Sequence, residues 1–109
     1  MKAGREINAL VAENVMGRAK NDNSVPNYSG DIVHACAVAD FMVLHAKRFR
    51  VENSEYFVLR FDLSTKEWEA GFRSSDYDSI ESWDHVACAE TAPLAVSLMA
   101  LMAAAGERK

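Results

Sequence analysis

The chain has 109 residues, of which half are hydrophobic and 26% are charged, and its formal net charge is −4 at pH 7. This size and composition predict a single globular domain, 1-109, built around one hydrophobic core. The acidic balance argues against a protein that binds nucleic-acid phosphates, because such proteins carry a basic excess or stripe.

The basic residues and the cysteines are both interpreted as structural. Lys47, Arg48 and Arg50 form the basic cluster at the end of a predicted helix, where cations complement the negative end of the helix dipole. Cys36 and Cys88 lie far apart in apolar stretches and lack metal-binding spacing. We therefore expect both to pack as small core side chains in a reducing cytoplasm.

Two helices are predicted in the first half of the chain. From Arg5 to Gly17, apolar residues recur at helical spacing, whereas polar residues that include Asn8 face away from the stripe. The polar stretch Arg18 to Asn27 is predicted to be an exposed loop. The second helix extends from Ile32 to about Phe49, and because two of its faces are apolar it is expected to lie between the sheet and another element.

Three strands and a third helix follow. Strict alternation predicts strands from Tyr56 to Leu63 and from Glu67 to Arg73, joined as a hairpin, and a short third strand from His85 to Ala89. The last helix begins after Thr91, a good N-cap, and ends at Gly106. The expected fold is therefore α+β: a small three-stranded antiparallel sheet packed with three helices in the order ααβββα.

Three motifs resemble one known family. They are Ile7-Asn8-Ala9-Leu10-Val11-Ala12-Glu13 with Met16-Gly17, then Tyr28-Ser29-Gly30-Asp31-Ile32, then Glu90-Thr91-Ala92-Pro93-Leu94-Ala95. In this order and spacing they resemble the phage ABA-sandwich domain family, and more distantly the NinX-like proteins of lambdoid phages. The resemblance implies a small accessory protein of a phage or prophage, with helices on both sides of a sheet and no established catalytic activity.

The starts of the second and third helices give the first candidate site. Tyr28, Ser29, Asp31 and Thr91 would line a small polar pocket if the fold brings the two starts together, because helix N-termini bind anions such as the phosphate of a nucleotide. The alternative, which we favour, is that Ser29 and Thr91 only cap their helices. Asp31 would also repel an anion at this place.

The acidic stretch between the second and third strands gives the second candidate site. We propose it as a partner-binding loop because it interleaves acidic and aromatic side chains: Asp76, Tyr77, Asp78, Glu81 and Trp83. It could also bind Ca²⁺ or imitate a phosphate backbone, although it lacks the full pattern of an EF-hand loop. A solvated loop without a ligand is the simplest interpretation.

The last helix is apolar on all sides from Ala92 to Ala105, which is too short a stretch to cross a bilayer. Either Met99, Leu101 or Met102 is exposed and mediates a homodimer, or the sheet and the second helix cover this helix completely. Both alternatives remain open at this stage.

We expect a non-enzymatic accessory phage protein in the cytoplasm of the bacterial host cell, without membrane segment, metal, cofactor or catalytic residues. It would act by binding, as a homodimer through the last helix, and most simply as an antagonist of a host protein or defence system. The alternative function is a small-ligand-binding protein that holds a nucleotide-like molecule at the two helix starts. An enzyme with an unrecognised site is a third, weaker alternative.

Overall fold

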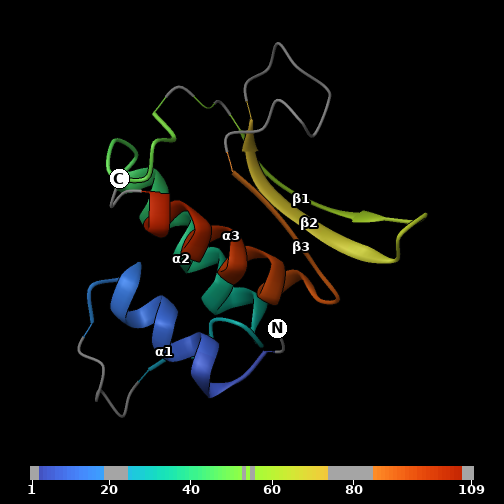
Figure 1. Ribbon diagram of the computed structural model, residues 1–109, viewed down its shortest axis with the longest axis horizontal. Helices are drawn as coiled ribbons and strands as arrows, with labels where there is room; N and C mark the ends of the chain where they lie inside the picture. The colour runs from blue at the N-terminus through green and yellow to red at the C-terminus, as the bar shows by residue number, and fades with distance from the viewer. Residues whose placement is uncertain (1–2, 19–24, 53, 55, 74–84, 107–109) are drawn as a thin grey trace.

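The computed structural model describes residues 3–18, 25–52, 54, 56–73 and 85–106. Its elements are α1 (Arg5–Asn14), α2 (Ile32–Leu44), β1 (Tyr56–Asp62), β2 (Glu67–Arg73), β3 (His85–Ala89) and α3 (Ala92–Gly106). Figure 1 shows the helices grouped beside a small curved sheet. The predicted α+β fold with the order ααβββα is confirmed.

The three strands form one antiparallel sheet in the order β1-β2-β3. At the hairpin between β1 and β2, the Asp62 carboxylate accepts hydrogen bonds from the Ser64 backbone N–H (2.8 Å) and the Ser64 hydroxyl (2.6 Å). These two hydrogen bonds, first from the side chain and then from the backbone of Ser64, lower the pKa of Asp62. The chain reverses at Lys66, whose φ of 63° is left-handed and whose N–H donates to the Asp62 carbonyl. β1 consequently ends one residue before the predicted Leu63.

The register separates the side chains onto two faces of the sheet, as the alternation predicts. On the inner face, Phe57 pairs with Phe72 and Phe61 pairs with Trp68, with ring centroids 5.3 and 5.5 Å apart. On the outer face, Arg60, Glu69 and Cys88 form one row across the three strands. Core side chains from the helices meet the inner face around Phe72 and Ala70, which are buried.

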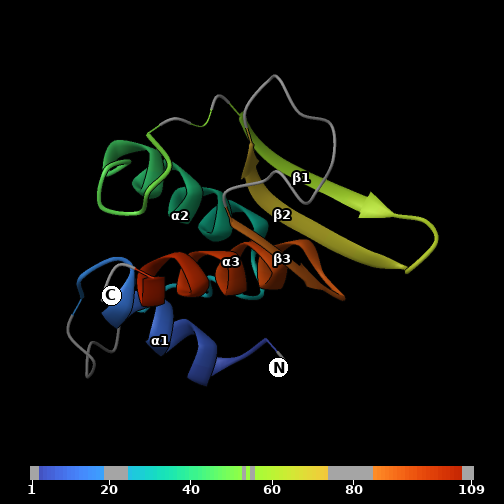
Figure 2. The ribbon, with the colours of Figure 1, turned by 45° about the horizontal axis from the view of Figure 1, so that its top comes forward.

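α3 is the central element of the fold. It packs against β2 and β3 on one side and contacts both α2 and α1. Figure 2 shows α2 and α1 on different sides of α3. Since α3 is the helix that packs directly on the sheet, the described helices are not arranged as one layer on each face of the sheet. Four of its eight buried residues are alanines. The eight are Leu94, Ala95, Val96, Ser97, Met99, Ala100, Ala103 and Ala104. Small side chains allow three neighbours to approach this helix closely.

The first two helices are shorter than predicted. α1 ends at Asn14, and the chain turns away through Gly17, whose φ is 73°. The Arg48 guanidinium donates to the carbonyl oxygens of Asn14 (3.0 Å) and Val15 (3.1 Å), so it caps the C-terminal end of α1 and not that of its own helix. α2 ends at Leu44 because residues 45–50 form turns that bring Arg48 to this position.

Three expectations about burial are wrong. α2 does not lie between two layers: only one of its faces packs on α3, and the opposite face is exposed. Cys36 and Cys88 are both exposed and are not core side chains. Asn8, which was expected to face solvent, is buried. Among the described residues, no helix has the length and apolarity that are needed to span a bilayer.

Ser97 in α3 provides a test of the core packing. Its side chain is fully buried, and its hydroxyl has no hydrogen-bond partner among the described residues. Because an unsatisfied buried hydroxyl is destabilising, Ser97→Ala should raise the free energy of unfolding by about 1–3 kcal/mol, as measured by urea denaturation. Ser64→Ala should instead lower it, since the Ser64 hydroxyl donates to Asp62. A loss of stability in Ser97→Ala would show that this hydroxyl is bonded.

Candidate functional site

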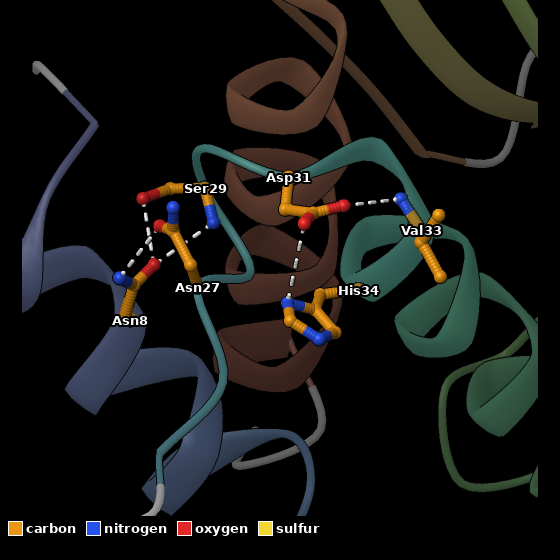
Figure 3. A network of polar contacts seen from close by, with 6 residues as sticks. All are labelled: Asn8, Asn27, Ser29, Asp31, Val33 and His34. Atoms are coloured by element: carbon orange, nitrogen blue, oxygen red, sulfur yellow. Dashed lines mark hydrogen bonds and ion pairs between the residues drawn. The ribbon is translucent and has the colours of Figure 1, made fainter.

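A buried polar network joins the start of α1 to the turn before α2 (Figure 3). The Asn8 side-chain oxygen accepts hydrogen bonds from the Ser29 backbone N–H (2.8 Å) and the Ser29 hydroxyl (2.7 Å). The Ser29 hydroxyl oxygen also accepts from the Gly4 backbone N–H (3.0 Å). The Asn8 amide donates to the Asn27 side-chain oxygen (3.0 Å). Every polar group of Ser29 that was a candidate for ligand binding is therefore used within the fold.

Gly30 lies directly against the Asn27 side chain of the same network. A Cβ at this position would lie 2.5 Å from Asn27 Nδ2, which is too close for any real contact. A larger residue would displace the Asn27 side chain from Asn8. A side chain at position 30 would therefore require the exposed Asn27 side chain to move.

The N-cap of α2 is Asp31 and not the predicted Ser29. The Asp31 carboxylate accepts a hydrogen bond from the Val33 backbone N–H (2.8 Å), which satisfies one of the free donors at the helix start. Its second oxygen lies 3.9 Å from His34 Nδ1, an ion pair when the imidazole is protonated. Figure 3 shows both contacts on the side of the turn away from Asn8. The positive end of this helix thus already faces a carboxylate of its own chain.

The four residues of the predicted polar pocket differ in exposure. Tyr28 and Ser29 are buried, Asp31 is partly exposed, and Thr91 is exposed at the start of α3. The Thr91 carbonyl accepts from the Ala95 N–H, as expected for the residue that precedes the helix. None of these four residues lines the apolar groove that is described below. This geometry supports a structural role for Ser29 and Asp31.

Replacing Asn8 tests this structural role. Asn8→Ala would leave the buried Ser29 N–H without an acceptor, and we expect the free energy of unfolding to fall by about 1–3 kcal/mol. Asn27→Ala removes one hydrogen bond from an exposed side chain and should cost less. Equal effects of the two substitutions in urea denaturation would contradict the assignment of Asn8 as the centre of the network.

An open apolar groove lies between α1, α3 and β3, and we call it the β3 groove. Its volume is about 530 Å³, and it is lined by Leu10, Ala87, Cys88, Leu98, Leu101, Met102 and Ala105. The α3 residues recur at helical spacing and present one side of that helix. Ala87 and Cys88 are successive strand residues, whose side chains point to opposite faces of the sheet. A groove that contacts both must therefore run along the outer edge of β3.

The outer face of the sheet next to this edge is acidic. Glu69 on β2 is largely buried, and its carboxylate pairs with Arg60 Nε on β1 at 2.7 Å. Cys88 on β3 lies beside Glu69 in the register. Burial raises the pKa of the Cys88 thiol, and the negative charges of Glu69, Glu67 and Asp62 raise it further. Cys88 is consequently exposed but poorly ionised, and poor ionisation makes a thiol a weak nucleophile.

Alkylation kinetics test the environment of Cys88. In a Cys36→Ser background, maleimide should label Cys88 more slowly than a free cysteine at neutral pH, because the raised pKa reduces the thiolate fraction. Glu69→Gln should accelerate labelling, since it removes a negative charge next to the thiol. Glu13→Gln on the exposed part of α1 is the matched control and should leave the rate unchanged. A rate–pH profile that Glu69→Gln does not shift would refute the electrostatic cause.

The predicted acidic loop lies outside the described residues, including Asp76, Tyr77, Asp78, Glu81 and Trp83. Within the described part of the chain, no three His, Cys, Asp or Glu side chains are grouped as metal ligands. Comparison with protein-family models, with curated proteins and with solved structures gives no match to this chain.

Proposed function

We propose that the chain is a non-enzymatic accessory protein of a phage or prophage that acts in the host cytoplasm by binding a host protein, in line with its resemblance to the phage ABA-sandwich family. The antagonised protein would be a component of the host or of its defence system. The observation that carries a binding function is the β3 groove, which combines an apolar floor with the edge of a strand.

The groove has the chemistry of a protein-binding surface. Its lining is made of aliphatic and sulfur-containing side chains, and Met102 in this lining is 53% exposed. Contiguous exposed apolar surface marks interaction sites in soluble proteins. Methionine adapts its shape to different partners because it is unbranched and polarizable.

The edge of β3 offers main-chain hydrogen-bonding groups to a partner. β3 is the terminal strand of the sheet, and no other described strand pairs with its outer edge. An extended segment of a partner would add to this edge through main-chain hydrogen bonds, and its alternate side chains would enter the groove. This mode of recognition requires no reactive group on the protein.

The structure bears on two other hypotheses, a nucleotide pocket and a homodimer. A nucleotide pocket at the helix starts has no specific observation in its favour, because Ser29 is hydrogen-bonded to Asn8 and Gly4. A homodimer through α3 would use the same surface as a partner, since Met99 is buried and Met102 lies in the groove. We propose that a partner protein occupies the groove, and the test below distinguishes it from a second copy of the chain.

The test replaces Met102 with a charged residue. Met102→Glu should reduce capture of the bound protein from a bacterial lysate at least about tenfold, because a buried charge costs more than the 1.4 kcal/mol that a factor of ten represents. Leu63→Glu, at a 75% exposed position of the hairpin, is the matched control and should retain capture. Hydrogen exchange of the β3 amides should slow when the partner is bound.

Equal capture by wild type and Met102→Glu, as measured by quantitative mass spectrometry, would refute the role of the groove. A dimer in light scattering that Met102→Glu converts to a monomer would replace the partner protein with a second copy.

A further inference from the structure

The exposed side of α2 is a second apolar surface, distinct from the β3 groove. Its large side chains are unusually exposed for a helix in a small domain: Ile32 42%, Val33 71%, Val43 56% and Leu44 81%. We call this surface the α2 face, and its members are Ile32, Val33, Cys36, Ala37, Asp40, Val43 and Leu44. At about 100° per residue these seven positions cover an arc of about 140°. The opposite arc holds Ala35, Val38, Ala39 and Met42, which are buried against the core.

The shape of the α2 face suits a helix. Its large residues lie at the two ends, with Ile32 and Val33 in the first turn and Val43 and Leu44 in the last. The middle carries the small side chains of Cys36 and Ala37, which let a second helix approach closely. Apolar anchors at this spacing are typical of helix-in-groove and helix–helix recognition.

Asp40 is the one charged residue on the α2 face. It is exposed, and no cationic side chain pairs with it in the part of the chain that the structure describes. An approaching apolar helix would remove its carboxylate from water, which is unfavourable unless a cation meets it. The surface therefore selects a partner that places a positive charge opposite Asp40.

A second copy of this chain does not supply that charge. The face extends from Ile32 to Leu44, so its midpoint is residue 38. In an antiparallel two-fold pair, the two Asp40 residues would lie four positions apart along the axis, about 6 Å. In a parallel pair they would lie directly opposite. Either arrangement brings like charges together on an apolar surface, and self-association through this face is disfavoured.

From this charge pattern we infer that the α2 face is a docking surface for an amphipathic helix of another protein, one that presents an apolar stripe with a Lys or Arg facing Asp40. The inference is independent of the β3 groove, because α2 and α1 lie on different sides of α3 (Figure 2). Cys36 belongs to one surface and Cys88 to the other.

A yeast-displayed library of single-helix peptides, randomised along one stripe, tests this inference against the purified full chain. Sorting on wild type should enrich apolar residues at helical spacing, with Lys or Arg favoured over Asp or Glu at the central position by about fivefold, the effect of an ion pair near 1 kcal/mol. Asp40→Lys should reverse this preference, and Asp40→Asn should abolish it while binding persists. Leu44→Glu should eliminate binding, whereas Met102→Glu in the groove is the matched control and should have no effect.

Unchanged melting temperatures would establish that the exposed substitutions leave the fold intact. Absence of any enriched helix, or enrichment without a preference at the central position, would overturn the proposal. So would binding that is lost in Met102→Glu but kept in Leu44→Glu, because the peptides would then occupy the groove. A wild-type dimer in light scattering that Leu44→Glu dissociates would overturn it in favour of a second copy.

Discussion

The packing of α3 against three neighbours determines most of this structure. It contacts the sheet through β2 and β3 and separates α1 from α2. A helix in this position has little free surface, so its side chains must be apolar and mostly small, and its buried alanines meet that requirement. The side of α3 that these neighbours leave uncovered contributes Leu98, Leu101 and Met102 to the β3 groove. The groove thus results from the way in which the core is closed.

Polar contacts fix how α1 and α2 join this core. Asn8 binds the turn that contains Ser29, while Arg48 binds the last carbonyls of α1. One contact holds the start of α1 and the other holds its end, although their partners are 21 and 33 positions away in the chain. α1 is consequently positioned by hydrogen bonds at both ends and by its apolar residues, such as Ile7 and Val11, between them.

The sheet could be predicted from the sequence because its information is local. Large apolar residues recur at every second position, Phe57, Leu59 and Phe61, and a period of two predicts a strand. The end of α2 could not be predicted, because Arg48, which the sequence placed in this helix, lies beyond it and binds carbonyls of α1, a contact distant in sequence. Asn8 was wrongly predicted to face solvent because its burial also depends on a contact distant in sequence, the hydrogen bonds that it accepts from Ser29. In the candidate site, the prediction that Ser29 caps α2 was wrong: Asp31 caps this helix, and Ser29 binds Asn8 instead. The groove depends on three elements that meet only in the fold.

The two sides of α2 have different roles. Ala35, Val38, Ala39 and Met42 hold it in place, and the seven residues on the other arc contribute nothing to the core. Substitutions on the outer arc therefore change the exposed surface of this helix and should affect the core less than substitutions on the inner arc. If the chain and its target coevolve, successive variants would differ mainly at positions such as Val33, Asp40 and Leu44, while the inner arc stays constant.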